Sequence, residues 1–452
     1  MTRDSQVTPH PNESPPLWQQ LQACAQAVQA VRQGSNHSLA LDKVPPRLRA
    51  GVQALLFAVL REWGRTQAIR QHLVQRQPAP AVDALLCVGL ALLVPDAAGM
   101  YPAHTLVNQL VEAAKRDRNT QAQAAFINAC VRRFTREKNA CLQVVNQQLS
   151  ARWNHPAWWI QAVQQDHPDD WPALLQASLQ PAPMAVRVNR RQITREALQQ
   201  HWLDNGVHSQ PVGEDGLLLQ QARSVQLLPG FAQGWWSVQD PAAQLAAALL
   251  LQAPGASVNK KRRVLDACAA PGGKTAHMLE MADVELLALE IDAHRCGLVT
   301  QNLTRLGLQA SVQCADAAAP SSWWDGRLFD AILLDAPCTA SGIVRRHPDI
   351  PWLRRPSDIA GLAAQQKALL NTLWPLLAPG GHLLYCTCSV FRQEGVEQIE
   401  TFRANNTDAV LHPSPGQLIP GKASNSHTLS DNLRGEHDGF FYALLQRSAT
   451  GN

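Results

Sequence analysis

The sequence predicts a multidomain protein in which an all-helical domain precedes an α/β domain with a mostly parallel sheet. From residue 17 to about 150, apolar residues recur at three- and four-residue intervals, which is the spacing of one buried helix face. From Arg262 onward, short strand-like apolar runs alternate with helical patterns, as they do in βαβ units. The length of 452 residues fits two or three domains of roughly 100 to 200 residues each.

The composition excludes several other classes of protein. Apolar residues make up 46% of the chain and charged residues 17%, which argues against wholesale disorder. The longest uncharged apolar runs, such as 84–95, fall short of the roughly 20 residues that a membrane-spanning helix needs. The ten cysteines are scattered, as expected for free thiols in a reducing compartment. Residues 1–16 lack the pattern of a signal peptide, so we expect a flexible leader on a cytoplasmic protein without a membrane partner.

The amino-terminal third follows helical periodicity and is interrupted only by breakers. Proline-containing breakers at 45–46, 77–80 and 95–96 divide it, and strict alternation of apolar and polar residues is absent. We therefore predict a helical bundle over residues 17–150. Its apolar spacing is illustrated by Leu17, Leu21, Cys24, Val28 and Val31.

Positive charge is concentrated in the same segment. Residues 1–150 hold 16 Lys and Arg against 9 Asp and Glu, whereas the remainder holds 24 against 27. Because phosphate neutralisation dominates nucleic-acid affinity, the surplus predicts a surface for a polyanion, with a solvated helical face as the alternative. The densest basic stretch supplies the candidate contacts Lys115, Arg116, Arg118, Arg132, Arg133 and Arg136.

Three further segments follow the helical domain. Residues 151–182 are rich in Trp and Pro and predict a linker with short helices, in which the indoles anchor packing. Mixed signals over 183–255 predict a small α/β subdomain, and 256–452 predict the larger α/β domain.

The larger domain has the alternation of a Rossmann-like fold, with a parallel sheet covered by helices on both faces. Residues 439–445 predict a last strand, antiparallel at the edge of the sheet. Helical patterns lie between the other strands, notably at 294–306 and 359–377. The candidate parallel strands are 264–267, 284–291, 311–315, 329–335 and 382–386.

The first of these strands leads into a turn of small residues at the start of a helix. Small residues there let backbone amides approach a nucleotide-like ligand. The turn is not the G-x-G-x-x-G fingerprint of dinucleotide sites, and it lacks the first glycine of a phosphate-binding loop. Neither a dinucleotide nor a nucleoside triphosphate is therefore favoured. The turn consists of Cys268, Ala269, Ala270, Pro271, Gly272, Gly273 and Lys274.

Acidic residues follow the next two strands. Glu290 ends the second predicted strand, and Asp316 comes just after the third. An acid in the first position can hydrogen-bond ribose hydroxyls, and both positions adjoin one crevice, although either residue alone could be a solvated loop acid. Together with the turn they predict an adenosine moiety without phosphates, as in S-adenosylmethionine. We expect no metal.

Two cysteines lie just beyond the fourth and fifth strands. Cys338 follows Asp335, and Cys388 lies within the run Tyr385 to Ser389. Open α/β sheets hold their ligands at the carboxyl ends of their strands, so we interpret both thiols as functional. The ordinary role of cysteine as a small buried apolar residue is expected for Cys24, Cys87, Cys130 and Cys141.

Five motifs carry a resemblance to a known family: CAAPGGK at 268–274, DAPCTASG at 335–342, RRHPDI at 345–350, YCTCS at 385–389 and DGFFYA at 438–443. Together they resemble the Sun/Fmu family of RNA cytosine-5 methyltransferases, over residues from about 17 to 447. Within the family, the whole chain resembles the bacterial members that act on 16S ribosomal RNA, whose helical domain is similar to the antitermination factor NusB. The resemblance implies a NusB-like RNA-binding bundle followed by a class I S-adenosylmethionine-dependent methyltransferase domain.

The resemblance also implies roles for individual residues. Cys388 is the implied nucleophile, and Cys338 is the thiol that assists release. Carbon 5 of cytosine is a poor nucleophile until a thiolate adds to carbon 6, and the adduct must then lose a proton and expel the thiolate. Asp335 is implied to contact the cytosine edge and the cofactor. The turn 268–274, Glu290 and Asp316 are implied to surround the cofactor.

Two positions depart from the family's pattern. Glu290 stands where Asp is common, and this longer acid can still reach a ribose. Cys386 stands where Ala or Ser is usual, which leaves a redox role open for this thiol.

Two arginines and a histidine follow Cys338 in the sequence. We expect Arg345 and Arg346 to contact the phosphates of a flipped nucleotide, whereas His347 is either structural or catalytic.

The expected partner of this monomer is 16S ribosomal RNA. The alternatives are a transfer RNA methyltransferase, a DNA cytosine-5 enzyme in which Cys338 attacks, and an antitermination-type RNA-binding factor with an inert catalytic domain.

Overall fold

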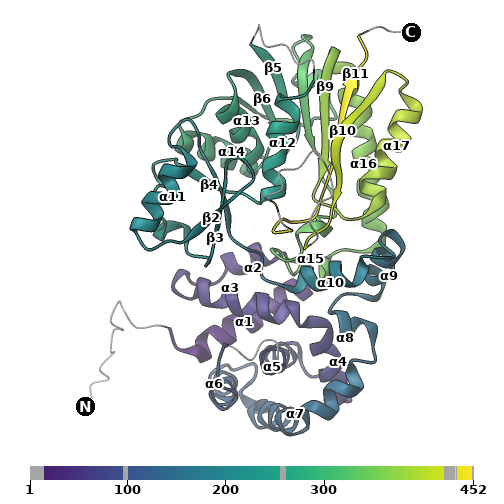
Figure 1. The fold of residues 1–452 in the computed structure, drawn as a ribbon. Coiled ribbons are helices and arrows are strands. Elements are labelled where there is room, and N and C mark those ends of the chain that lie inside the picture. The colour runs from purple at the N-terminus through teal and green to yellow at the C-terminus, as the bar shows by residue number, and fades with distance from the viewer. Residues whose placement is uncertain (1–14, 95–99, 255–260, 422–432, 434, 450–452) are drawn as a thin grey trace. The chain divides into compact units, whose positions relative to one another are not determined.

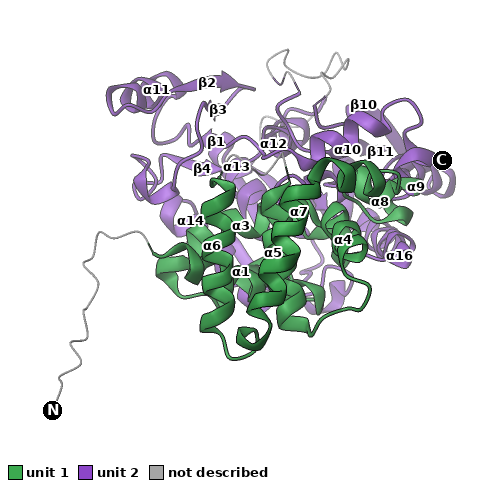
Figure 2. Cartoon of the chain, turned by 90° about the horizontal axis from the view of Figure 1, so that it is seen from below, with its two compact units in different colours: residues 1–161, 347–353 green, residues 162–346, 354–452 purple. Residues whose placement is uncertain are grey.

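The computed structural model describes residues 15–94, 100–254, 261–421, 433 and 435–449. The chain forms two compact units, which Figure 2 shows in green and purple. One unit comprises residues 1–161 and 347–353, and the other comprises residues 162–346 and 354–452. No helix in the described ranges is both long and apolar enough to cross a membrane.

The amino-terminal unit contains helices and, among its described residues, no strand, as the apolar spacing predicts. Two predicted breakers begin helices, because Pro46 and Pro80 occupy first-turn positions where the missing N–H costs nothing. The breaker at 95–96 lies outside the described residues. The helices are α1 (Leu17–Arg32), α2 (His37–Asp42), α3 (Pro46–Arg61), α4 (Trp63–Leu73), α5 (Pro80–Leu93), α6 (Ala103–Arg116), α7 (Ala124–Val145), α8 (Leu149–Trp153) and α15 (Ile350–Leu353), and α9 (Ala157–Asp166) spans the junction of the two units.

Helix α5 lies at the centre of this unit, in contact with α1, α3, α4, α6 and α7 (Figure 1). Every residue from Val82 to Leu93 is buried, which explains why the helix is apolar on all sides. The four thiols expected to be structural, Cys24, Cys87, Cys130 and Cys141, are all buried, which confirms that prediction. Burial raises the pKa of Cys87 to about 12.

The second unit begins with α10 (Trp171–Leu179) and a small antiparallel sheet. Helix α11 (Arg195–Asp204) packs on this sheet through Leu198 and Trp202. The Trp202 ring meets the Trp236 ring edge-on, with 5.5 Å between the ring centroids. The strand order is β2 (Ser209–Val212), β3 (Gly216–Leu219), β1 (Ala185–Val188), β4 (Trp236–Val238).

The larger sheet has seven strands in the order β10-β11-β9-β8-β5-β6-β7. Each of its five parallel strands overlaps a predicted strand, and the prediction for 329–335 matches both ends of β8. The parallel strands are β5 (Arg262–Asp266), β6 (Val284–Glu290), β7 (Ser311–Cys314), β8 (Phe329–Asp335) and β9 (Leu377–Thr387).

Helices cover both faces of this sheet, as predicted. Helices α12 (Pro241–Leu251), α13 (Gly273–Met281) and α14 (Ala293–Leu306) contribute to one apolar core. Helices α16 (Pro356–Leu373) and α17 (Val396–Asn405) contribute to a second core, and Figure 1 shows the two groups on opposite sides of the strands. Burial on both faces explains why the inner strands β6 and β8 are mostly apolar.

The carboxyl-terminal strand departs from its prediction. Strand β11 (Phe440–Arg447) is antiparallel to β9, as expected, but it does not form the edge of the sheet. Strand β10 (Ala409–Leu418) pairs with its other side and is outermost. The sequence gives no strand signal there because β10 contains Pro413 and Pro415, which an edge strand tolerates since one row of its N–H groups has no partner strand.

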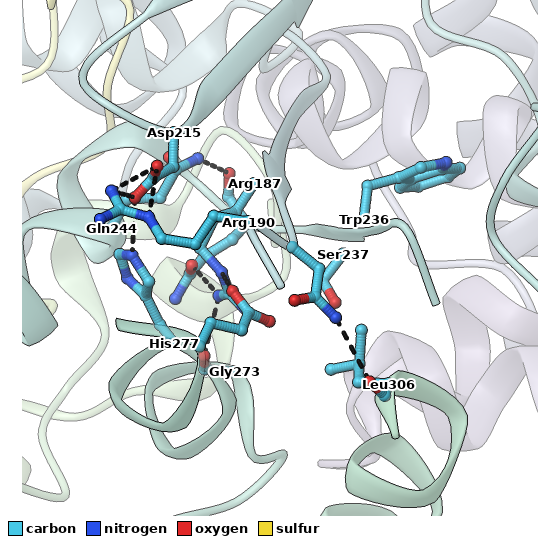
Figure 3. A network of polar contacts seen from close by, with 12 residues as sticks. Arg187, Arg190, Asp215, Trp236, Ser237, Gln244, Gly273, His277 and Leu306 are labelled. Carbon is cyan, nitrogen blue, oxygen red and sulfur yellow. Dashed lines mark hydrogen bonds and ion pairs between the residues drawn. The ribbon is translucent and has the colours of Figure 1, made fainter. Parts of the chain in front are cut away.

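A buried ionic network joins the small sheet to the larger domain (Figure 3). Arg187 of β1 is fully buried and donates two 2.8 Å hydrogen bonds to the carboxylate of Glu280 in α13. It also donates to the carbonyl oxygen of Gly273, the first residue of α13, at 2.9 Å. His277 of the same helix lies 3.2 Å from the Asp215 carboxylate in the turn between β2 and β3. The small sheet is thereby fixed to the helix that begins at the predicted cofactor turn.

Candidate active site

The predicted cofactor turn connects β5 to α13. Gly272 caps α13 with a φ of 96°, in the left-handed region that glycine adopts without strain. A Cβ at this position would lie 3.2 Å from the Cα of Val299 in α14, so close packing also favours glycine. The N–H of Ala269 donates to the carbonyl oxygen of Leu289 at 2.8 Å, which holds the turn against β6.

The two predicted ribose-side acids lie at the same edge of the sheet as this turn, because β6 and β7 follow β5 in parallel order. Glu290 is buried and accepts a hydrogen bond from the N–H of Asp292 at 3.1 Å. Asp316 is exposed and accepts from the N–H of Ala318 at 2.8 Å. The structure thus brings the turn and both acids to one edge.

An ion pair links the turn to β8. The Lys274 ammonium lies 2.6 Å from the carboxylate of Asp335, the last residue of β8. Burial disfavours the charged form of this lysine, but the Asp335 carboxylate, together with Cys386 and Cys388, outweighs burial and raises the pKa of Lys274. The ammonium also lies 5.3 Å from the centre of the Phe440 ring. Asp335 is therefore held in place by the turn itself.

The thiols of Cys338 and Cys388 are brought together, with 3.4 Å between their sulfur atoms. Strands β8 and β9 are parallel neighbours and pair Asp335 with Cys386, so the loops that follow start side by side. The hydrogen bond with Cys388, together with burial, raises the pKa of Cys338. Both sulfur atoms can therefore face adjacent atoms of one small planar ring.

Two further thiols near this site, those of Cys386 and Cys268, are chemically protected. Cys386 is buried, and its sulfur lies 3.5 Å from the Asp335 carboxylate. Burial, and then that carboxylate, raise the pKa of Cys386 and likewise that of Cys268. Because the thiolate is the reactive form of cysteine, this placement gives no support to a redox role for Cys386.

The two arginines expected at phosphates are engaged inside the protein. Arg345 is buried and pairs with Asp438. Arg346 pairs with Asp438 as well and with Asp240 at 2.8 Å. Both carboxylates are buried, and ion pairing offsets the cost of burying these charges. This placement argues against phosphate contacts by Arg345 and Arg346, because their charge is neutralised within the fold.

His347 belongs to the amino-terminal unit together with the rest of 347–353. Its ring centroid lies 5.0 Å from that of His37, and Nδ1 of His37 lies 2.9 Å from the Asp349 carboxylate. These contacts support the structural role of His347.

The six basic residues predicted to contact RNA are exposed on α6, on α7 and in the turn between them. Arg116 pairs with Glu112, and both Arg133 and Arg136 pair with Glu137. No ion pair engages the other three within the described part of the chain, so their charge is available to a ligand. These three are Lys115, Arg118 and Arg132.

Sequence reasoning missed two buried acids beneath the site. Asp266 ends β5 and accepts a hydrogen bond from the Thr275 hydroxyl at 2.6 Å. Glu394 is fully buried behind the thiol loops and accepts from Thr339 and Ser389. Each is a lone acid in an ordinary stretch of sequence, so no spacing distinguishes it from a solvated residue.

Burial raises the pKa of Asp266 to about 7. The Thr275 hydrogen bond and the Lys274 charge lower this pKa, whereas the Asp335 charge adds to the effect of burial. Across the residues that the structure describes, no group of three or more His, Cys, Asp and Glu side chains is arranged to hold a metal ion.

The strand order, the glycine turn and the acids on successive strands define a Rossmann-like methyltransferase domain, which follows a NusB-type helical domain. The NusB family model matches residues 18–136, and a model for the ferredoxin-like domain of RsmF/B-like methyltransferases matches residues 155–226. A third model, described as 16S rRNA methyltransferase RsmB/F, matches residues 256–446. The chain belongs to this RsmB/F family, which confirms the resemblance to RsmB with its NusB-like domain.

Curated relatives and solved structures agree with this assignment. Ribosomal RNA small subunit methyltransferase B of Vibrio cholerae is 38% identical over 419 residues, which cover 90% of this chain and 92% of that protein. The protein of the same name from Pseudomonas syringae pv. tomato is 40% identical over 442 residues, covering 94% and 96%. The crystal structure of PH0851 has a TM-score of 0.75 at 22% identity, covering 95% of this chain and 99% of that chain. NSun6 from Pyrococcus horikoshii has a TM-score of 0.55 at 19% identity and covers 66% of this chain and 99% of its own. At these identities the two structures show a shared fold.

The raised pKa of Asp266 predicts a pH-dependent stability. The pKa of Asp266 is about 7 in the folded protein, whereas an aspartate in the unfolded chain has a pKa of about 4. Between these values the folded state binds more protons, so this group makes the free energy of unfolding fall as pH rises. Asp266→Asn keeps an acceptor for Thr275 and does not titrate. Urea unfolding should show wild type losing stability relative to Asp266→Asn across this window. A constant offset between the two proteins at every pH would contradict the assignment.

Proposed function

We propose that the protein transfers a methyl group from S-adenosylmethionine to carbon 5 of a cytosine in 16S ribosomal RNA, through a covalent bond between Cys388 and the base. The observation that carries this proposal is the pair of thiols 3.4 Å apart beside Asp335. The name of the curated relatives supports ribosomal RNA of the small subunit as the substrate, and the description of the family supports 16S ribosomal RNA.

The chemistry requires a nucleophile that activates the base. When the Cys388 thiolate adds to carbon 6, the electron pair of the carbon 5–carbon 6 double bond moves onto carbon 5, which can then accept a methyl group. S-adenosylmethionine supplies that group as a sulfonium, whose carbon–sulfur bond breaks as the new carbon–carbon bond forms. Loss of the carbon 5 proton to a base then restores the double bond and expels the Cys388 thiolate.

Cys338 fits the second half of this cycle. Its hydrogen bond with Cys388, together with burial, raises the pKa of Cys338, so the Cys338 thiol keeps its proton when Cys388 attacks as the negatively charged thiolate. Once the Cys388 sulfur is bonded to carbon 6, that charge is gone and Cys338 can release its proton to solvent. Its thiolate can then accept the proton from carbon 5.

Asp335 is proposed to orient the cytosine. Asp335 is the last residue of β8, the strand beside the one that leads to Cys388, and the Lys274 ammonium lies 2.6 Å from its carboxylate. A carboxylate accepts hydrogen bonds only, so it suits the amino group on the cytosine edge. Asp335 is also proposed to contact the cofactor, as the family resemblance implies, because Lys274 of the turn 268–274 binds its carboxylate.

The cofactor assignment rests on the turn 268–274 and on the two acids. Backbone amides at the start of α13 can face the ligand, and Glu290 and Asp316 at the adjoining strand ends can accept from ribose hydroxyls. The membership of a methyltransferase family supports this ligand, and the NSun6 structure of the same fold was determined with SFG.

The helical unit is proposed to hold the RNA. Its exposed residues Lys115, Arg118 and Arg132 carry charge that no described carboxylate neutralises, and contacts with phosphates fix register without reading sequence. Ribosomal RNA as a substrate in turn favours a cytoplasmic location. We propose the domain boundaries 17–150, 151–182, 183–255 and 256–452 for the bundle, the linker, the small subdomain and the methyltransferase domain.

Mutation should distinguish the roles of the two thiols. Cys388→Ala should abolish methylation, because attack on carbon 6 is obligatory, whereas Cys338→Ala should leave RNA on the protein as a denaturant-resistant adduct. Denaturing gels with labelled RNA measure the adduct, and bisulfite sequencing measures the product. An adduct in Cys388→Ala and none in Cys338→Ala would reverse the roles, as in the DNA-type mechanism. Wild-type protein that binds RNA but forms neither adduct nor product would favour the antitermination-type factor.

The cofactor site should discriminate by ligand class. Calorimetry should show binding of S-adenosylmethionine and S-adenosylhomocysteine but not of NADH. Glu290→Ala should weaken binding by roughly tenfold or more, the usual cost of losing hydrogen bonds to a charged group. Glu285→Ala removes an exposed acid from the same strand and serves as the matched control. Equal cofactor affinity in wild type and Glu290→Ala would refute the ribose assignment.

Charge reversal should separate RNA capture from cofactor binding. A triple variant with Lys115→Glu, Arg118→Glu and Arg132→Glu should bind RNA several-fold more weakly and with a flatter salt dependence, because each lost phosphate contact removes about one unit of slope. Its affinity for S-adenosylmethionine should be intact. An unchanged salt slope in a variant shown to be folded by circular dichroism would mean that these helices form a solvated or protein-docking face.

A further inference from the structure

A buried carboxylate lies behind the two thiols and has no part in the mechanism above. Glu394 ends the 3-10 helix Arg392–Glu394, which follows β9, and its side chain is fully buried. Oε1 accepts from the N–H of Thr339 at 2.9 Å and from Nε2 of Gln366 at 3.1 Å. Oε2 accepts from the hydroxyls of Thr339 at 2.5 Å and Ser389 at 2.6 Å. A carboxylate offers about four acceptor sites, so these four donors use its whole capacity.

These contacts tie one thiol loop to the other. Thr339 follows Cys338 directly, and Ser389 follows Cys388 directly. Both residues bind the same oxygen of Glu394, so the carboxylate bridges the two loops one residue away from each sulfur. A further bridge runs from the Ser389 hydroxyl to that of Ser341 at 2.9 Å.

The surroundings of Glu394 supply a donor to each of its hydrogen-bonding positions. The Gln366 amide is oriented by the Tyr385 hydroxyl, which donates to its Oε1 at 3.0 Å and leaves Nε2 facing the carboxylate. Burial raises the pKa of Glu394, and the hydrogen bonds from Ser389 and Thr339 oppose that effect. The Thr339 N–H and the Gln366 amide can only donate to Glu394, whereas the Thr339 and Ser389 hydroxyls can donate or accept. An amide at this position would lose the negative charge that strengthens all four hydrogen bonds.

We propose that Glu394 is a positioning residue that sets the separation of Cys338 and Cys388, and through it the balance between attack on carbon 6 and release of the product. The catalytic consequence rests on the proposed function, whereas the effect on the distance between the sulfur atoms does not. Reacting atoms must approach within about 3 to 3.5 Å, and a misplacement of about 1 Å can cost about 100-fold in rate. Two thiols that serve neighbouring carbons of one ring therefore need their loops fixed relative to each other.

The first test measures the distance between the thiols without RNA or cofactor. Diamide removes one hydrogen from each thiol and is itself reduced to the hydrazine, so the rate of the Cys338–Cys388 disulfide reports how often the two sulfur atoms meet in bonding geometry. Peptide mapping by mass spectrometry identifies that disulfide among the other cysteines. Glu394→Gln should slow its formation about tenfold. Glu397→Gln, which removes an exposed carboxylate from α17, should leave the rate unchanged.

The second test separates positioning from a purely structural role. In Glu394→Gln, kcat should fall by about 10- to 100-fold while KM for RNA changes by less than about twofold, and trapped adduct should accumulate because Cys338 is displaced from it. Ile399→Ala removes a buried apolar side chain from α17. It serves as the control for a loss of stability that leaves Glu394 and its hydrogen bonds in place. It should change neither the rate of disulfide formation nor the amount of adduct.

A second variant covers the case in which Glu394→Gln does not fold. Thr339→Val removes the hydroxyl that binds Glu394 and should slow disulfide formation, whereas Thr339→Ser keeps the hydroxyl and should restore the wild-type rate. Equal rates of disulfide formation in wild type, Glu394→Gln and Thr339→Val would overturn the proposal, as would a loss of kcat that Ile399→Ala reproduces. If wild-type protein shows no methyl transfer, the proposed function fails, and the disulfide comparison still decides whether Glu394 sets the separation of the thiols.

Discussion

The site depends on the parallel pairing of β8 with β9. That pairing places Asp335 opposite Cys386, so the loops that carry Cys338 and Cys388 leave the sheet side by side. The central position of β5, next to β8, brings the Gly272 turn to the same edge, where Lys274 reaches Asp335. A shift of one residue between β8 and β9 would turn each side chain to the other face and dismantle this arrangement.

Buried polar groups hold the edge of the sheet in place. Arg187 of the small sheet donates a hydrogen bond to the first residue of α13, and Asp266 accepts one from Thr275 beneath the turn. Glu394 accepts hydrogen bonds from both thiol loops. Each group would be costly to bury alone, and each is paired or hydrogen-bonded. The stability of the domain and the geometry of its site are therefore coupled through these buried groups.

Ion pairs within the protein engage several of the positive charges that the sequence offers to a ligand. The pair Arg345 and Arg346 has the composition of a phosphate contact, but the buried carboxylates of Asp240 and Asp438 neutralise it. Ion pairs on α6 and α7 engage Arg116, Arg133 and Arg136 as well, which leaves fewer free cations than the count suggests. Partners distant in the sequence decide which positive charges remain for a ligand.

The sequence by itself determined the helical bundle, the parallel strands, the cofactor turn and the two loop thiols. Those features are local, because apolar periodicity, glycine in a tight turn and residues at strand ends follow from short-range geometry. Only the tertiary structure decided that β10 lies outside β11, that Arg345 is neutralised and that Glu394 joins the two thiol loops. Strand order, ion pairing and burial depend on contacts between residues far apart in the chain, and no pattern in a short stretch of sequence encodes them.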